Sequence, residues 1–359
     1  MKEMPVTVKR SIELLGLFLL GAVFVIGQFI IMPILMAFFF SLMLMPIFRF
    51  FKRLRVPEVI AIFLPILLLT VFAALIVWLF YSQVGLLLGD FPQIQRNIIR
   101  HLDALSRWVS NVFGYSPADQ MNFINEQSNK LFNSAGSILR SAAGSVTSIL
   151  LFFGLLPIYI YLIILYRSLF LKFIMMWVEP AEHATMQKVM RQAEGMAKSY
   201  LVGLLIQITY IIILLWLTLI IFGIKHALLI GIVFAFLNLI PYLGALIGNI
   251  LGVLITLASS ESIADVIIVL GAIAVVQFLD NNILMPRIVG SQVKINALVS
   301  IIGIFIGGAM AGIAGMFLAM PVIAILKIVF DHSEKLKKWG VLLGDDRPAK
   351  KRKYERYPT

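Results

Sequence analysis

Apolar residues dominate this chain from about residue 12 to residue 330, with few of the polar interruptions that mark a soluble protein. A transmembrane helix needs roughly 20 mostly apolar residues to cross a hydrocarbon layer of about 30 Å. The stretches that approach or exceed this length are Ile12–Ile31, Pro33–Phe48, Val59–Phe80, Ile149–Tyr166, Leu204–Ile224, Ala227–Ala258, Val266–Leu279 and Ala297–Phe330. The pattern predicts a polytopic integral membrane protein.

The continuity of these stretches favours helices over a transmembrane β-barrel. Barrel strands alternate apolar and polar residues over about ten positions, whereas these stretches are apolar throughout. Because unpaired peptide groups are costly in lipid, each stretch should satisfy its backbone internally. We therefore expect an all-α fold with about eight hydrophobic segments. The 359 residues are 61% hydrophobic and include no cysteine, which excludes disulfides and thiolate ligands.

Basic residues next to the apolar stretches indicate the topology. They occur at Lys9 and Arg10, at 49–55, and at Arg167 and Lys172. Excess Lys and Arg mark cytoplasmic loops, so the segment between the third and fourth stretches should lie outside. We expect N-terminal membrane spans (1–82), an amphipathic extracytoplasmic helical insertion (83–147), a C-terminal membrane core (148–330) with a cytoplasmic linker (167–200), and a basic cytoplasmic tail (331–359).

The net charge of +12 does not indicate a nucleic-acid partner, since no aromatic-interleaved groove accompanies the basic tail. In the insertion, apolar residues at helical spacing, including Ile94, Ile98 and Leu102, predict an amphipathic helix. A second helix is expected to begin near Ser116. The apolar stripe needs a cover, which could be its neighbour helix, the bilayer surface or a second protomer. We expect a homo-oligomer, because the stripe and the glycine-rich stretches offer more packing surface than one chain uses.

Two of the long stretches are interrupted by glycine and proline. Ala227–Ala258 contains Pro241, Gly244 and Gly248, and Ala297–Phe330 contains Gly307, Gly308, Gly312, Gly315 and Pro321. Broken helices offer helix ends and free carbonyls to a transported substrate, but glycines can also simply permit tight packing. Hydropathy leaves open whether each stretch is one kinked span or a hairpin, and with it the side on which 280–296 lies. We favour broken or re-entrant stretches.

The densest polar group next to apolar sequence is LDNNILMPRIVG at 279–290. The transport or substrate candidates are Asp280, Asn281, Asn282 and Arg287. A carboxylate here could bind a cation or carry a proton, and the amides could bind a polar solute. The alternative is a helix-ending loop in which Asp280 and Arg287 form an ion pair at the interface.

The order and spacing of IPYLGALIG at 240–248, DNNILMPRIVG at 280–290 and GGAMAGIAGMFLAMPVIAI at 307–325 resemble the predicted-permease family of autoinducer-2 exporter-like transporters. The resemblance implies a multispanning transporter without an ATPase domain, and members have been assigned autoinducer-2 export or sodium or lithium/proton antiport. The matching motif positions are Pro241, Gly244, Gly248, Asp280, Asn281, Pro286, Gly290, Gly307, Gly308, Gly312, Gly315 and Pro321.

No catalytic motif is recognisable. The chain has no HExxH, GxxxxGK[ST] or G-x-S-x-G sequence, and its four histidines lack metal-ligand spacing. We expect a multi-pass protein of the bacterial plasma (inner) membrane with both termini in the cytoplasm. It should transport a small polar solute such as autoinducer-2, or a monovalent cation or proton, without a cofactor and without enzymatic activity. A non-transporting membrane scaffold is the alternative from another functional class.

Overall fold

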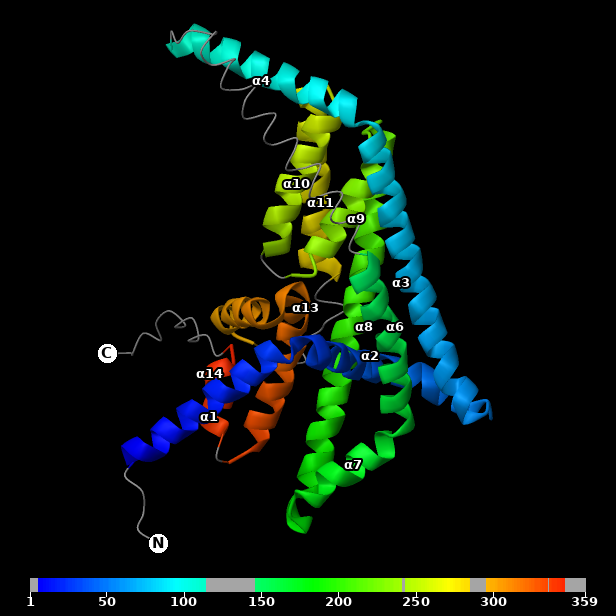
Figure 1. Cartoon of the computed structure of the whole chain (residues 1–359), viewed down its shortest axis with the longest axis vertical. Helices are drawn as coiled ribbons and strands as arrows, with labels where there is room; N and C mark the ends of the chain where they lie inside the picture. The colour runs from blue at the N-terminus through cyan, green and yellow to red at the C-terminus, as the bar shows by residue number, and fades with distance from the viewer. Residues whose placement is uncertain (1–5, 114–145, 241–242, 285–294, 335, 346–359) are drawn as a thin grey trace, which may run out of the picture. The chain divides into compact units, whose positions relative to one another are not determined.

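The computed structural model describes residues 6–113, 146–240, 243–284, 295–334 and 336–345, and every named element within them is helical (Figure 1). The all-α class is confirmed. In this described part, five helical stretches are long and apolar enough to cross a membrane, or up to six if the bent pair α6–α7 counts as one. The expected number of eight segments is therefore approximate. The helix predicted to begin near Ser116 lies outside the described residues.

The chain runs through the following elements in order. The first half contains α1 (Val6–Ile26), α2 (Gln28–Arg53), α3 (Glu58–Gly89), α4 (Phe91–Phe113), α6 (Val146–Leu165) and α7 (Arg167–Met176). The second half contains the 3-10 turn η1 (Pro180–Glu182), α8 (His183–Ile221), α9 (Ala227–Leu237), α10 (Leu243–Ser259), α11 (Ile263–Leu279), the π-helical turn η2 (Asp280–Leu284), α13 (Ala297–His332) and α14 (Lys337–Leu343).

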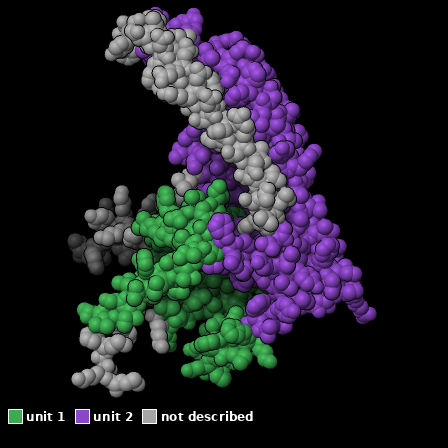
Figure 2. Space-filling model, in the orientation of Figure 1, with its two compact units in different colours: residues 1–28, 171–197, 291–359 green, residues 29–170, 198–290 purple. Residues whose placement is uncertain are grey.

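Contacts divide the chain into two compact units (Figure 2). Unit 1 comprises Met1–Gln28, Leu171–Ala197 and Ser291–Thr359, and unit 2 comprises Phe29–Phe170 and Lys198–Gly290. α1, α13 and α14 therefore belong to unit 1, and α3, α4, α6, α9, α10 and α11 belong to unit 2.

At one end of unit 2, the segment after α2 meets the bend between α6 and α7. Arg167, at this 62° bend, donates from Nη1 to Oε1 of Glu58 at 3.2 Å and to the carbonyl of Ile164 at 2.7 Å. Its guanidinium also lies 4.6 Å from the ring centre of Phe48. The contacts join two regions whose basic residues predict a cytoplasmic location.

α4 lies at the opposite end of unit 2, because α3 begins beside Arg167 and its 32 residues rise about 48 Å before α4 starts (Figure 1). The predicted amphipathic helix is thus present, and it packs against α10. Asn97 donates to the carbonyl of Ala258 at 3.1 Å, and His101 Nε2 lies 2.9 Å from the carbonyl of Ser260. These polar contacts satisfy carbonyls at the C-terminal end of α10, which have no partner within that helix.

The first interrupted stretch is a helical hairpin of α9 and α10. Glycines recur every four residues along α10. Gly244 faces the backbone of Leu237 and Gly248 faces the ring of Phe234. Gly252 faces Ile230 and also Ile273 of α11. The partners step backward along α9, so the two helices are antiparallel. With 11 residues, α9 rises only about 16 Å, roughly half of the hydrocarbon layer. The expected glycine stripe is confirmed as a packing surface for a neighbouring helix.

The second interrupted stretch, α13, also folds back on itself. Its backbone leaves helical geometry at Ala311 and Gly312, and Gly312 has a φ of 59°, which favours glycine. Across this break, the facing pairs are Gly303 with Ile323, Gly307 with Gly315 and Ala319, and Gly308 with Met316. By length α13 would count as one span, but these pairs define an antiparallel hairpin.

The prediction of two broken stretches is therefore confirmed, and both are hairpins. Pro321 is buried in the second arm of α13. The other predicted motif residues Pro241, Pro286 and Gly290 lie outside the described residues. One boundary was wrong: the sequence placed a break between the first two stretches near Pro33, whereas the chain breaks at Gly27 and α2 contains Pro33. Pro33 is the sixth residue of α2, so its missing N–H removes one helical hydrogen bond, to the carbonyl of Phe29, without ending the helix.

Candidate functional site

The candidate site centres on Asp280, at the end of α11. Asp280 is only 1% exposed. Its backbone N–H still bonds to the carbonyls of α11, while the residue itself begins the π-helical turn η2. Such turns are rare in helices and occur often at functional positions. Here the turn follows a predicted membrane-spanning helix, and its first residue carries the buried carboxylate.

Three neutral side chains donate hydrogen bonds to this carboxylate. Gln207 Nε2 lies 2.7 Å from Asp280 Oδ2, and Asn238 Nδ2 lies 3.1 Å from the same oxygen. The hydroxyl of Tyr210 donates to Oδ1. Both carboxylate oxygens of Asp280 thus accept hydrogen bonds from side chains of the protein.

The elements that supply these donors explain why they meet. Gln207 and Tyr210 are three residues apart on α8 and therefore share one helix face. Asn238 is the C-cap of α9, at the tip of the α9–α10 hairpin. Two helix ends and the side of a third helix thus converge on one point, as expected for a site built from interrupted helices.

The depth of the cluster follows from the helices that lead to it. The turn between α8 and α9 and the turn between α10 and α11 both contact α4, through Lys225–Gln93 and Ser260–His101. From that end, α9 rises about 16 Å before Asn238 and α11 rises about 26 Å before Asp280. The carboxylate therefore lies at the ends of α9 and α11 that are remote from α4.

The electrostatics of the cluster are unusual for a buried acid. Among the described residues, no basic side chain forms an ion pair with Asp280. Burying a charge is costly unless it is paired or well hydrogen-bonded, and within the described ranges only neutral donors meet it. The acidic site can therefore accept a proton, a cation or the donor groups of a polar solute.

Two further polar atoms on α8 are available to a ligand. Gln207 Oε1 and the hydroxyl of Tyr200 are buried and have no hydrogen-bond partner in the described part of the chain. Tyr200 lies two turns before Gln207 on the same face of α8, about 10 Å along the helix axis. Buried polar groups of this kind normally bond to water or to a ligand. They extend the polar surface beyond the carboxylate.

The structure separates the four predicted candidates. Asp280 is buried in the cluster, while Asn281 and Asn282 are exposed. Asn281 Oδ1 accepts from Gln277 at 3.4 Å, and Asn282 donates to the carbonyl of Phe278 at 2.9 Å, so both bond within their own helix turns. Arg287 lies outside the described residues, and its predicted pairing with Asp280 remains a prediction.

Sequence reasoning did not find Gln207, Tyr210 or Asn238. A signal was present, because Gln207 is a strongly polar residue within the apolar stretch Leu204–Ile224. Polar residues inside membrane helices usually face the bundle interior. The pairing with Asp280 could not be read from the sequence, since the two residues are 73 positions apart.

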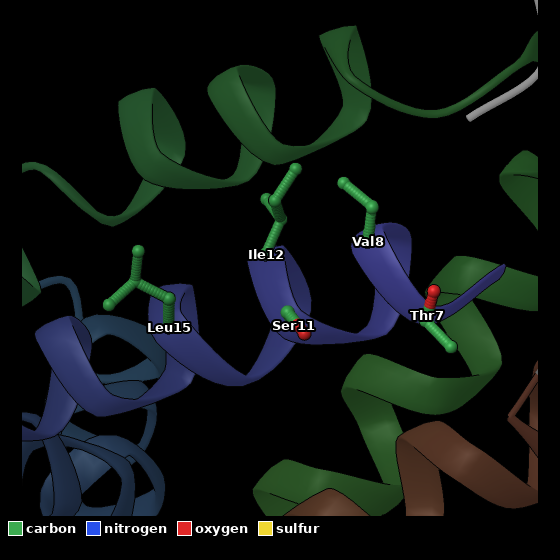
Figure 3. A pocket seen from close by; sticks show the side chains of 5 residues that line it. All are labelled: Thr7, Val8, Ser11, Ile12 and Leu15. Carbon is green, nitrogen blue, oxygen red and sulfur yellow. The ribbon is translucent and has the colours of Figure 1, made fainter. Parts of the chain in front are cut away.

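The described part of the chain also has a shallow hollow along α1, with a volume of about 270 Å³ (Figure 3). It is lined by Thr7, Val8, Ser11, Ile12 and Leu15. Its only side-chain polar groups are two hydroxyls, so it lacks the carboxylate and amide groups of the Asp280 cluster. We therefore take the cluster as the candidate site.

Long apolar helices, helical hairpins and a buried carboxylate at a helix end are each typical of multi-pass membrane transporters. Residues 14–335 match the sequence profile described as AI-2E family transporter. The chain therefore belongs to the AI-2E transporter family, which confirms the expected resemblance.

Individual relatives are similar over most of their length. The AI-2 transport protein TqsA of Escherichia coli (strain K12) is 26% identical over 319 residues, which cover 88% of this chain and 90% of TqsA. YrrI of Bacillus subtilis (strain 168) is 24% identical over 315 residues, covering 86% of this chain and 88% of YrrI. YhhT of Escherichia coli (strain K12) is 23% identical over 319 residues, covering 89% of each chain.

Proposed function

We propose that this protein exports a small polar solute such as autoinducer-2, with Asp280 as the group that binds the solute or a coupling ion. The observation that supports the proposal is the burial of Asp280 among Gln207, Tyr210 and Asn238, on helices that are mostly apolar. The similarity to TqsA, which is named as an AI-2 transport protein, makes autoinducer-2 the first solute to test.

The chemistry of the cluster suits a solute rich in hydroxyl groups. A hydroxyl can donate to Asp280 or to the unpartnered Oε1 of Gln207 and can accept from the amide of Asn238. A solute that enters would compete with the internal donors of Asp280. Their release would free the tip of the α9–α10 hairpin, which gives binding a direct route to a conformational change.

The second candidate function is sodium or lithium/proton antiport. It is favoured by a specific feature, the buried carboxylate with neutral donors beside one amide oxygen that has no partner among the described residues. Carboxylate and amide oxygens are suitable ligands for a hard monovalent cation, and the same carboxylate can take up a proton. A membrane scaffold without transport is the third alternative, and it would leave this acidic cluster without a role.

Flux measurements in proteoliposomes separate these functions. Purified protein should move autoinducer-2 across vesicles that lack other proteins, and a pH or sodium gradient should change the rate if export is ion-coupled. Cation and proton exchange without autoinducer-2 movement would favour the antiporter. If correctly inserted protein moves neither autoinducer-2 nor cations, the scaffold would be favoured.

We also propose that both termini and the 49–56 and 167–200 segments lie in the cytoplasm and that the 83–147 insertion lies outside. The charge distribution and the contact of Arg167 with Glu58 support this orientation. A tag near Pro117 should be labelled in intact cells after removal of any outer barrier. Labelling only after permeabilisation of the plasma membrane would reverse the assignment.

We also propose that the chain self-associates. Leu105, Trp108 and Val112 of α4 are each more than half exposed, and they add to an apolar surface that a second copy could cover. Mass measurement in mild detergent or nanodiscs should give a multiple of the 40.2 kDa chain mass. A single chain mass at all concentrations would contradict the proposal.

A further inference from the structure

α14 folds back onto both ends of the α13 hairpin. The carbonyl of Leu343 accepts from the backbone N–H of Asn296 at 3.0 Å, and Asn296 is the N-cap of α13. Gly340 is buried against Asp331 in the last turn of α13, and a Cβ at Gly340 would lie 3.1 Å from the Asp331 nitrogen. α14 therefore holds together the two ends of the hairpin.

The contact with α13 fixes which side of α14 faces outward. Since Gly340 faces α13, the helical rotation of about 100° per residue turns positions 338, 339, 341 and 342 away from it. Trp339 is 57% exposed, Val341 61% and Leu342 57%, and Lys337 and Lys338 are exposed as well. The outward side thus combines a tryptophan and two aliphatic residues with Lys338, and Lys337 is exposed at the edge of this side, about 60° from the direction of Gly340.

The hairpin places this surface at the boundary of the membrane. The arms of α13 are antiparallel and apolar, so both ends of the hairpin emerge on the same side of the hydrocarbon layer. A short helix that bridges these ends lies at the depth of the lipid headgroups. Tryptophan is enriched at this depth, and lysines there attract anionic headgroups.

We propose that α14 binds anionic lipid headgroups, with Lys337 and Lys338 contacting phosphate groups and Trp339 and Leu342 inserted beside the acyl chains. The charge of the helix favours this partner over a second copy of the chain, whose own α14 would bring the same positive charge. Bound lipid would fix the ends of the α13 hairpin, because α14 touches both of them.

The absence of cysteine allows a direct test on the full-length protein. Leu342→Cys, and separately Val341→Cys, would each carry one environment-sensitive fluorophore, and the protein would be placed in nanodiscs. One set would contain phosphatidylcholine alone and the other an added fraction of phosphatidylglycerol. A lipid with a nitroxide near the headgroup would report contact by quenching.

We expect stronger quenching when phosphatidylglycerol is present. A lysine near an anionic surface shifts the docking equilibrium about fivefold, so Lys337→Gln with Lys338→Gln should shift it about thirtyfold and abolish the added quenching. Lys188→Gln with Lys198→Gln makes the same change in net charge at exposed positions of α8 and should leave the quenching intact.

Three results would overturn the proposal. Equal quenching in both lipid mixtures would mean that headgroup charge is not recognised. If the added quenching persists in the Lys337/Lys338 variant, or is lost in the Lys188/Lys198 variant, Lys337 and Lys338 are not the residues that recognise the lipid. Absence of quenching in every nanodisc, with efficient crosslinking between two chains that both carry Leu342→Cys, would identify a second copy as the occupant.

Discussion

The amide of Gln207 on α8 donates a 2.7 Å hydrogen bond to the carboxylate of Asp280 at the end of α11. Both residues are almost fully buried, at 2% and 1% exposure. The pair joins the middle of one membrane helix to the end of another, beside the tip of a hairpin. We propose a role in transport for this acid because an apolar residue would fill the same place at lower cost.

Removal of one donor should impair transport without unfolding the protein. Tyr210→Phe deletes only the hydroxyl that meets Asp280 Oδ1. A hydrogen bond to a charged group contributes about 1.5–3 kcal/mol, so flux should fall about tenfold or more if this bond orients the carboxylate for transport. Tyr166→Phe removes an exposed hydroxyl from the same type of side chain and is the control. Equal flux in both variants would exclude Tyr210 from the mechanism.

The α13 hairpin should not tolerate a side chain where its arms touch. A Cβ at Gly315 would collide with the carbonyl of Gly307, so Gly315→Ala should destabilise the protein by about 1–3 kcal/mol. Gly271→Ala on α11 is the matched control, because nothing lies within 4 Å of its new methyl group. Thermal unfolding in detergent would compare them. If the two variants melt alike, the close packing of the α13 arms is wrong.

The attachment of α4 to α10 should be weakened by the loss of one buried amide. Asn97 is 1% exposed and bonds to the carbonyl of Ala258, so Asn97→Ala leaves that carbonyl without its partner at a cost of about 1–3 kcal/mol. Hydrogen exchange along α4 should accelerate about tenfold or more. Asn111→Ala changes an exposed residue of the same helix and should leave exchange unchanged. Unaltered exchange in Asn97→Ala would refute the anchoring role.

Stability should decrease as the pH falls through the histidine range, partly because of His226. This residue lies in the turn between α8 and α9, 5% exposed, with Nε2 3.3 Å from Asp90. Burial lowers the pKa of His226 below its ordinary value of 6.5, against the opposing effect of Asp90. The folded state thus binds a proton less readily than the unfolded state, so the stabilisation is complete above about pH 6.5 and is lost progressively below it.

His226→Asn should make the unfolding temperature less sensitive to pH in that range. Asparagine suits the position because His226 has a φ of 55°, a left-handed conformation that asparagine tolerates. The informative quantity is the difference between wild type and variant, since other groups titrate in both. Identical pH profiles would show that His226 contributes nothing to the acid sensitivity.

The sequence predicted those features that arise from local composition. Long apolar stretches identified the membrane helices, the periodicity of Ile94, Ile98 and Leu102 identified α4, and the glycine spacing identified the surfaces on which helices pack closely. The sequence could not identify the hairpins, because hydropathy is the same for a kinked span and for one that folds back at Gly312. Only the facing pairs, such as Gly307 with Gly315, distinguish the two.

Only part of the candidate site was predicted, because contacts between distant helices cannot be read from local composition. Asp280 is recognisable as an acid next to apolar sequence. Its partners Gln207 and Asn238 come from other helices, and their approach depends on how α8 and the α9–α10 hairpin pack. Asn281 and Asn282 share the motif, but the helical rotation after Asp280 turns them to the exposed side. Neighbours in a motif do not necessarily share a site.

The most direct test of the account is autoinducer-2 flux through proteoliposomes containing Asp280→Asn, measured beside wild type and Asp265→Asn. Asp265 lies in the first turn of the same helix and bonds to Ser260, outside the cluster, so the control makes the same chemical change on α11. We predict that Asp280→Asn falls to the level of protein-free vesicles while Asp265→Asn retains most of the wild-type flux, with equal expression and oligomeric state in all three. Wild-type flux in Asp280→Asn across the pH range would contradict the central claim.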